Sequence, residues 1–293
     1  MTSGQIDTFI AKHRLPDSYR SMIDDHFAPL VAWLVENCAS NRPTVVGING
    51  AQGSGKSTLA DFIGIALAEG VGWNVAVMSI DDFYLTKDER TRLGDDVHPL
   101  LVTRGVPGTH DLDLLDLTLD QLRNLGPGEE YRLPRFDKAR DDRAAADTWP
   151  TVSGPVDLVI LEGWCVGSSA QSEAALRQPV NDLERTNDAA GAWRRYVNEQ
   201  LAGPYADLFS RLDLLVFLQV PRFDAVYRWR LEQERKLADR SSGDAIMNDA
   251  QVAAFIQHFE RITRANLKSL PDIADVTLQL DDGHNCVRST YRP

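Results

Sequence analysis

The stretch GINGAQGSGKSTLADF, residues 47–62, decides how the rest of the sequence is interpreted. The phosphate-binding pattern G-x-x-x-x-G-K-S/T is satisfied there by Gly50, Gly55, Lys56 and Ser57. A β-branched run precedes the match and an apolar helical pattern follows it, which is the context that the motif needs. Glycines let backbone N–H groups point at phosphate oxygens, and the next helix adds its positive end. The stretch predicts a nucleotide-phosphate site; the alternative is a flexible turn with a solvated lysine.

The residues of this loop have separate predicted roles. Lys56 would reach the β and γ phosphates of ATP, and the Ser57 hydroxyl would ligate Mg²⁺. Contacts with the nucleotide are predicted for Gly50, Ala51, Gln52, Gly53, Ser54, Gly55, Lys56, Ser57 and Thr58.

Short runs rich in Val, Ile and Leu recur along the chain, and each is nearly continuous rather than alternating. They lie at 44–48, 74–80, 157–162, 213–220 and 275–280. Helical patterns separate them, at Ser57–Glu69, Asp113–Asn124, Asn181–Gln200, Asp224–Arg240 and Asn248–Lys268. Strands buried on both faces have this composition, so the pattern predicts an α/β fold. We expect a P-loop three-layer α/β/α architecture with a mainly parallel five-stranded sheet.

The same pattern predicts one domain with four parts. The expected boundaries are an N-terminal helical extension at 1–42, a core at 43–223, a helical lid at 224–268 and a returning C-terminal strand at 269–293. Pro29 is expected to kink a long helix in the extension, because proline cannot donate a backbone hydrogen bond. Residues 83–155 hold one good helical pattern among Asp, Arg, Gly and Pro, as expected of substrate-facing loops. The lid is joined by ADRSSGDA, at 238–245.

Composition excludes several classes of protein. The net charge of −12 argues against a nucleic-acid partner, which needs a basic face. No apolar stretch approaches the ~20 residues of a membrane span, and the N-terminus resembles neither a secretory signal nor a transit peptide. Cys38, Cys165 and Cys286 show no metal-ligand spacing, so free thiols in the cytoplasm are expected. Oligomeric state is left open.

Two predicted strands end in carboxylates. Asp81 and Asp82 follow the strand at 74–80, and Glu162 ends the strand at 157–162. Ligands of open α/β sheets bind beyond the carboxyl ends of the strands. A carboxylate there can hold a metal or accept a proton from an attacking hydroxyl; the alternative is a helix cap or turn. Neither an Asn-Lys-x-Asp motif nor a protein-kinase His-Arg-Asp loop is present, so phosphoryl transfer to a small acceptor is favoured.

Six further motifs sharpen this interpretation. They are SIDDFYLT (79–86), RGVPGTHDL (104–112), LPRFDKA (133–139), DDRAAADTWP (141–150), LEGWCVG (161–167) and VYRWRLEQE (226–234). In this order they resemble the motifs of plant-type D-glycerate 3-kinases and their bacterial and fungal relatives. More distantly, the layout is similar to uridine kinase, phosphoribulokinase and pantothenate kinase. The resemblance covers roughly residues 43–285 and is patchy between 165 and 212, so a different acceptor is the alternative if that region lines the site.

The resemblance implies roles for the carboxylates and for a basic segment. Asp81 would be the catalytic base, and Glu162 would hold Mg²⁺ together with Ser57. A glycerate-like acceptor has a carboxylate and two hydroxyls, which suit arginine beside Asp or His. The implied acceptor residues are Asp82, Arg104, His110, Asp111, Arg135, Asp137, Lys138 and Arg143. The alternative is a solvated loop with ion pairs inside 137–142.

Arg230 is the predicted lid arginine that contacts the transferring phosphate. The alternative is a surface ion pair with Glu234, four residues further along the helix. Trp164 and Trp229 are expected to pack rather than bind a base. His284 is expected in a surface turn; the alternative is a place near the adenine.

The sequence therefore predicts an ATP- and Mg²⁺-dependent kinase of a small hydroxy acid, with D-glycerate first. A kinase for a nucleoside, pantothenate or a sugar acid is the nearest alternative. An ATP-binding regulatory module without an acceptor is the alternative from another class.

Overall fold

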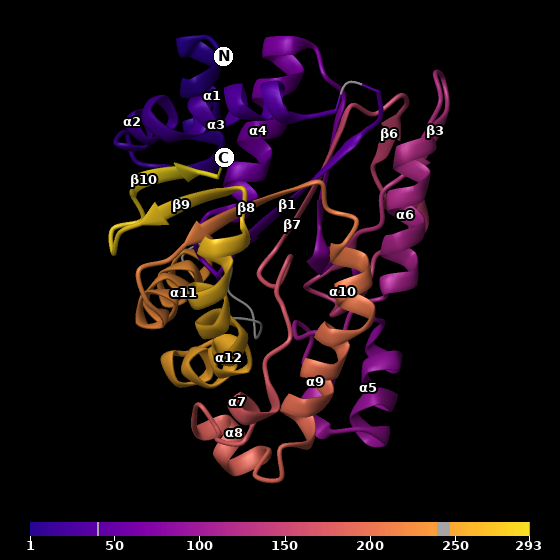
Figure 1. The fold of residues 1–293 in the computed structure, drawn as a ribbon, viewed down its shortest axis with the longest axis vertical. Coiled ribbons are helices and arrows are strands. Elements are labelled where there is room, and N and C mark those ends of the chain that lie inside the picture. Colours follow the sequence, from indigo (N-terminus) through magenta and orange to yellow (C-terminus); the bar gives the residue numbers. More distant parts are fainter. Residues whose placement is uncertain (40, 239–246, 293) are drawn as a thin grey trace.

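All five predicted strands lie in one central sheet (Figure 1). The computed structural model describes residues 1–39, 41–238 and 247–292. Within them the sheet has six strands in the order β10-β9-β8-β1-β7-β2. The strands are β1 (Thr44–Gly50), β2 (Val75–Ser79), β7 (Leu158–Gly163), β8 (Leu214–Gln219), β9 (Val276–Leu280) and β10 (Cys286–Tyr291). The first five are parallel, which confirms the predicted fold class, and β10 runs antiparallel to β9.

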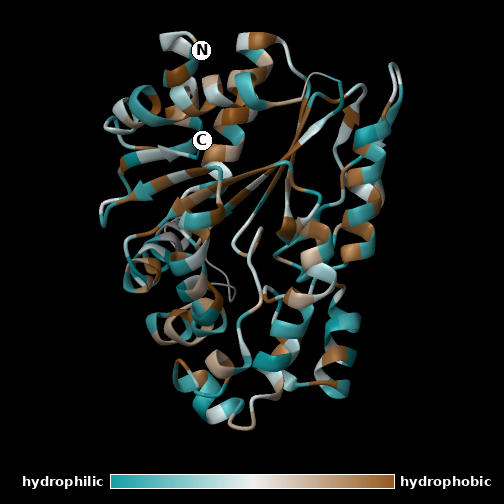
Figure 2. Ribbon diagram, in the orientation of Figure 1, coloured by the Kyte–Doolittle hydropathy of each residue, from teal (hydrophilic) through white to brown (hydrophobic). Residues whose placement is uncertain are grey.

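Helices cover both faces of the sheet, which explains why its strands are apolar throughout. Every residue of β1 and β7 is buried. On one face Val46 and Ile48 pack with α4 (Lys56–Val71), and on the other Val45 packs with α6 (Leu112–Asn124) and α9 (Ala192–Ala202). Figure 2 shows the hydrophobic strands in the middle and hydrophilic outer faces on the helices. The result is the expected three-layer arrangement.

The N-terminal extension packs against α4. It contains α1 (Ser3–His13), α2 (Tyr19–Met22), a π-helical turn (Ile23–Phe27) and α3 (Ala28–Asn37). Pro29 lies in the first turn of α3, where its missing N–H costs nothing, so it starts a helix rather than kinking one. Phe62 of α4 contacts Phe9 and Phe27, which fixes the extension on the core.

The region from 83 to 155 is more ordered than expected. It contains a 3₁₀ turn (Ile80–Phe83) at its start, α5 (Lys87–Asp96), a 3₁₀ turn (Pro99–Val102), α6, and a 3₁₀ turn (Ala146–Thr148). Two small antiparallel sheets pair β3 (Glu130–Arg132) with β6 (Thr151–Ser153) and, as a hairpin between them in the chain, β4 (Phe136–Asp137) with β5 (Asp142–Arg143). The expectation of a single helix was wrong because α5 is almost entirely polar, and its signal is the capping box of Thr86 and Glu89.

The segment between β7 and β8 forms α7 (Glu173–Leu176), α8 (Asp182–Asn187), α9 and α10 (Pro204–Phe209). The single helix expected at Asn181–Gln200 is therefore two helices. Asp188 separates them, because its carboxylate accepts the N–H groups of Trp193 and Arg194 at 2.9 and 3.1 Å. Gly191, at φ +77°, lets the chain turn between the two helices.

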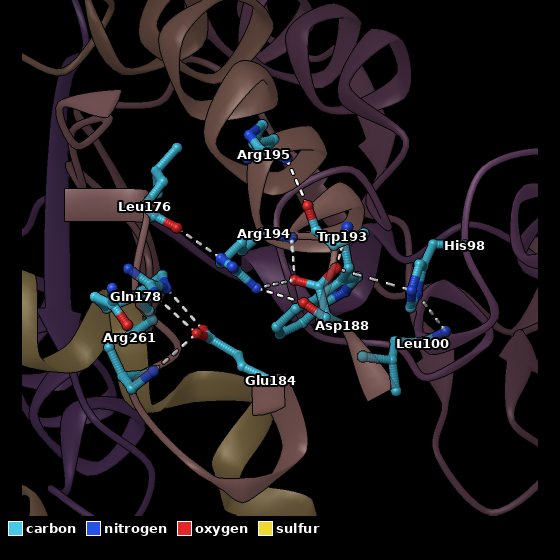
Figure 3. A network of polar contacts seen from close by, with 12 residues as sticks. His98, Leu100, Leu176, Gln178, Glu184, Asp188, Trp193, Arg194, Arg195 and Arg261 are labelled. Atoms are coloured by element: carbon cyan, nitrogen blue, oxygen red, sulfur yellow. Dashed lines mark hydrogen bonds and ion pairs between the residues drawn. The ribbon is translucent and has the colours of Figure 1, made fainter. Parts of the chain in front are cut away.

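A buried polar network ties this segment to the C-terminal helices (Figure 3). Arg194 pairs with Asp188 at 2.9 Å, and Arg261 pairs with Glu184 at 2.6 Å. All four side chains are at most 7% exposed. Because removing one partner would leave a buried charge unpaired, the network holds α8 firmly against the helix that carries Arg261.

The predicted lid corresponds to α11 (Phe223–Ala238) and α12 (Asp249–Ile273); its charged join falls mostly on residues 239–246, outside the described residues. The first turns of α11 are buried, with Ala225 and Val226 fully inaccessible. The C-terminal part, expected to hold one strand, begins inside α12 and holds both β9 and β10. The sixth strand follows a turn in which the Asp281 carboxylate accepts the N–H groups of Gly283 and Asn285.

Two further observations concern the chain as a whole. Cys38, Cys165 and Cys286 are all free thiols, as predicted. Among the described helices, none has the length and apolar character that crossing a membrane would require.

Candidate active site

The predicted phosphate loop connects the central strand β1 to α4. Gly53 and Gly55 have φ of +79° and +91°, where other L residues are strained. A Cβ at Gly50 would lie 2.5 Å from the Ser54 hydroxyl oxygen, so the loop closes tightly on itself. The Ser54 hydroxyl is buried and makes no hydrogen bond with any described residue. With the free N–H groups at the start of α4, this loop fits a bound anion.

Glu162 lies beside this loop at the end of β7. The strand register pairs it with Ile48 of β1 and with Ser79 of β2. The Ser57 hydroxyl donates to Glu162 Oε1 at 2.6 Å, and the Lys56 ammonium is 3.9 Å from Oε2. Oε2 is buried without a hydrogen-bond partner in the described part of the chain. A hydroxyl and a carboxylate oxygen are donors that Mg²⁺ accepts, so the pair predicted for the metal fits it.

Asp81 lies one strand further along, just after β2. Its Oδ1 accepts the Tyr84 hydroxyl and its Oδ2 accepts the Lys138 ammonium, both at 2.7 Å. Burial acts to raise the pKa of Asp81, but the ammonium groups of Lys138 and Lys56 outweigh it and hold that pKa far below its usual range. Asp81 is therefore a carboxylate at neutral pH, close to the lysine of the phosphate loop.

The neighbouring Asp82 carboxylate has different partners from Asp81. It accepts Arg135 Nη1 at 3.2 Å and the backbone N–H of Phe136 at 3.3 Å. Burial raises its pKa, and Arg135 opposes the change. These bonds hold the β4–β5 hairpin, residues 136–143, beside Asp81. Asp82 thus positions the hairpin that carries Lys138.

The basic segment pairs with distant acids rather than with itself. Arg104 pairs with Asp141, and Arg143 pairs with Asp111 at 2.7 Å. Asp111 also caps α6, accepting the backbone N–H of Leu114 at 3.0 Å. The ion pairs expected inside 137–142 by the alternative interpretation are therefore replaced by pairs between loops. These pairs bring together three of the predicted acceptor-site residues, Arg104, Asp111 and Arg143.

Asp137 does not share in these contacts. Its carboxylate accepts the backbone N–H groups of Ala139 and Arg140 at 3.0 and 3.2 Å, which closes the hairpin turn. Its role toward an acceptor stays a prediction, and its observed hydrogen bonds are those of a turn residue.

His110 lies behind Asp81, in the core of the site. Its Nδ1 is 2.6 Å from the Tyr205 hydroxyl, and its ring stacks on Tyr84 at 4.7 Å. Burial lowers the pKa of His110 to about 4, so the imidazole is neutral at pH 7. Tyr205 belongs to α10, in the region where the family resemblance is patchy, and only the fold shows that this region supports the site.

Arg230 is carried by α11 above the phosphate loop. A Cβ at Gly53 would lie 2.9 Å from Trp229 Cβ and 3.6 Å from the Arg230 nitrogen, so helix and loop touch. Arg230 pairs with Glu234, as the alternative interpretation expected, and its guanidinium lies 5.8 Å from the centroid of the Phe255 ring. Burial lowers its pKa, with Arg104 adding repulsion. The Arg230 backbone therefore lies next to the phosphate loop, and its guanidinium is close enough to Arg104 to feel its charge.

Three ring side chains had predicted places, and only His284 departs from its prediction. Trp164 and Trp229 are both 3% exposed, as predicted for packing residues. His284, expected in a surface turn, stacks on Trp229 at 3.8 Å, and its Nε2 lies 2.9 Å from the Gly53 carbonyl oxygen. The β9–β10 turn thus supports the phosphate loop from outside.

Arg90 is a supporting residue that the sequence did not reveal. It is 1% exposed and donates to the carbonyl oxygens of Leu85, Val102 and Asp141. It also forms an ion pair with the Asp141 carboxylate at 3.0 Å, and so joins three loops that surround the acceptor residues. No local pattern marks it, since most of its partners are backbone carbonyl oxygens.

Known kinases are similar to this chain over most of its length, although no family model matches it. An uncharacterised kinase of Schizosaccharomyces pombe is 35% identical over 226 residues, covering 74% of this chain and 79% of that protein. The chloroplastic D-glycerate 3-kinase of Arabidopsis thaliana is 30% identical over 262 residues. That match covers 84% of this chain and 54% of the plant protein, so this chain spans about half of its length.

A solved structure extends the similarity to the fold. D-glycerate 3-kinase from Cryptococcus neoformans matches with a TM-score of 0.72 at 26% identity. The match covers 91% of this chain and 96% of that one, so the similarity extends over most of the fold.

Proposed function

This chain belongs to the P-loop kinase family of plant-type D-glycerate 3-kinases and their bacterial and fungal relatives, and from that premise we propose that its acceptor is D-glycerate. The family and the kinase activity expected from the sequence are thereby confirmed, and ATP use follows from them. The observation that carries the proposal is the placement of Asp81 near Lys56, with Lys138 paired to Asp81 and Arg143 paired to Asp111.

The loop residues would bind the triphosphate of ATP. Backbone N–H groups of residues 50–57 and the Lys56 ammonium surround the β and γ phosphates. Ser57 and Glu162 would hold Mg²⁺, which neutralises charge on the phosphates when it is bound. The guanidinium of Arg230 would contact the transferring phosphate. These groups stabilise charge that is spread over the transferring phosphoryl oxygens.

Asp81 would accept the proton of the acceptor hydroxyl. Because the transition state of phosphoryl transfer is loose, the proton leaves late, and position matters more than basicity. A carboxylate with a depressed pKa suits this task, since it stays ionised throughout the physiological range. The acceptor oxygen then bonds to the γ phosphorus while ADP departs.

Arg104, Arg135 and Arg143 would bind the acceptor carboxylate from the loops opposite the nucleotide. Each is now paired with an acid, at Asp141, Asp82 and Asp111. A pocket that faces a carboxylate with guanidinium groups gains orientation as well as affinity from bidentate bonds. The neutral His110 is suited to a hydroxyl rather than to the carboxylate.

A coupled ADP-release assay tests the proposal. D-glycerate, a nucleoside, pantothenate and a sugar acid are compared at fixed ATP and Mg²⁺. Turnover that rises at least tenfold with D-glycerate alone supports it. Stimulation only by another acceptor would overturn the substrate assignment, and ATP binding without stimulation by any acceptor would overturn the acceptor site. The expectations of a cytoplasmic protein without nucleic-acid or membrane partners stay predictions.

A further inference from the structure

The Asp81 carboxylate has two partners that differ in how firmly they are held. The Tyr84 hydroxyl is bonded to Oδ1 and the Lys138 ammonium to Oδ2, each at 2.7 Å. Tyr84 is 5% exposed, whereas the Lys138 side chain is 61% exposed. One partner is thus part of the core, and the other reaches in from a surface hairpin.

Contacts from two segments fix the Tyr84 ring, and a third segment supports one of them. It stacks on His110 with an angle of 27° between the rings and meets the Phe136 edge at 5.2 Å. The backbones of Tyr84 and His110 form a β-bridge, and His110 is in turn bonded to Tyr205 of α10. The phenol cannot turn away from Asp81 without disturbing these contacts.

The direction of the hydrogen bond follows from the protonation states. Burial, followed by the charge of Asp81, raises the pKa of Tyr84 well above its ordinary value, so the phenol keeps its proton. A carboxylate only accepts, and a phenol has one hydrogen to donate. Tyr84 therefore occupies Oδ1 permanently and fixes the plane of the carboxylate. Oδ2 is the oxygen that can change partners.

We propose that Tyr84 is a positioning residue for Asp81 and that Lys138 stands where the acceptor hydroxyl binds. The inference rests on the proposed role of Asp81 as the base. On binding, the acceptor O–H replaces the Lys138 ammonium at Oδ2. The O–H bond then breaks and its proton passes to Oδ2. The acceptor oxygen bonds to the γ phosphorus of ATP, and the bond to the bridging oxygen breaks to release ADP. Lys138 is freed to pair with the acceptor carboxylate.

A double-mutant cycle on the full chain tests the positioning role, with ADP release measured at saturating MgATP and varied D-glycerate. Tyr84→Phe keeps the stacked ring and removes only the hydroxyl, so kcat falls about tenfold with little change in either KM. In an Asp81→Asn background, Tyr84→Phe adds no further loss, because the hydroxyl acts through the carboxylate. An equal loss in both backgrounds would show a merely structural role and overturn the proposal.

A second variant tests the exchange at Oδ2. Lys138→Met changes the KM for D-glycerate at least fivefold and kcat less than threefold, the reverse of the Tyr84→Phe pattern. A kcat loss as large as that of Tyr84→Phe, with KM unchanged, would mean that Lys138 holds Asp81 during catalysis. Tyr131→Phe is the matched control: its hydroxyl bonds Thr118 at 3.1 Å, outside the site, and the variant keeps wild-type kinetics.

Failure of the proposed function is separable from failure of this inference. If Asp81→Asn keeps its kcat, the assignment of Asp81 as the base fails. If Asp81→Asn loses kcat but Tyr84→Phe does not, only the positioning role of Tyr84 fails. A crystal structure of the Tyr84→Phe variant tests the positioning role without any acceptor, and so independently of the substrate assignment. The proposal predicts an Asp81 carboxylate rotated away from its present orientation, and an unchanged carboxylate contradicts it.

Discussion

The two halves of the site are built in different ways. Most of the nucleotide half is one continuous stretch, residues 50–57, whose ligands are mainly backbone N–H groups fixed by a strand and a helix, with Glu162 and Arg230 added from elsewhere in the chain. The acceptor half is assembled from segments near 81, 104–111 and 135–143, joined by ion pairs such as Arg143 with Asp111. Backbone geometry is encoded locally, whereas side-chain constellations depend on the whole fold. Substitutions should therefore act differently in the two halves.

The largest effect is expected where the nucleotide half meets the reaction. Lys56→Ala removes the ammonium that faces the transferring phosphate and Asp81, so transfer to any acceptor falls by about 10³-fold or more. Turnover is measured by ADP release with each acceptor of the panel. If Lys56→Ala keeps more than a tenth of the wild-type rate with any acceptor, the proposed difference between the two halves of the site is wrong.

A smaller and more selective effect is expected in the acceptor half. Arg143→Ala removes a guanidinium from the proposed carboxylate site, and the KM for D-glycerate rises about 10- to 100-fold, the scale of a charge-assisted hydrogen bond. The KM for ATP should stay within twofold. Arg211→Ala is the control, because Arg211 lies just before β8, at the amino ends of the parallel strands, and pairs there with Asp116 and Asp120 of α6. Equal changes in both KM values would contradict the account.

The smallest effect is on stability and concerns the core of the acceptor half. Since burial lowers the pKa of His110 to about 4, the unfolded chain binds a proton there that the folded chain excludes between about pH 6.5 and 4. Stability from this group is complete above pH 6.5 and is lost as pH falls, by about 2 kcal/mol at pH 5.

Denaturant unfolding at pH 7.5 and pH 5 checks this effect in the wild type and in His110→Gln. The wild type should lose about 2 kcal/mol more than the variant on acidification, because glutamine does not titrate. Equal losses would mean that His110 is protonated in the folded protein.

The same contrast explains how much could be predicted from the sequence. The phosphate loop and the parallel sheet follow from local patterns of glycine and of apolar residues. The supporting roles of Tyr205, Arg90 and His284 depend on contacts with residues far away in the chain, and no spacing marks them. The helix α5 was missed because it lacks an apolar face. The division of 181–200 into two helices was missed because nothing in the sequence distinguishes Asp188, the carboxylate that divides them, from other acidic residues.

The most direct test of the central claim is the Asp81→Asn variant, measured for ATP affinity and for turnover with D-glycerate. The account places Asp81 opposite the nucleotide and assigns it the proton of the acceptor. The dissociation constant for ATP should stay within threefold, while kcat falls by about 10²- to 10⁴-fold. A variant that keeps nearly full kcat, or one that loses ATP binding in proportion to turnover, would contradict it.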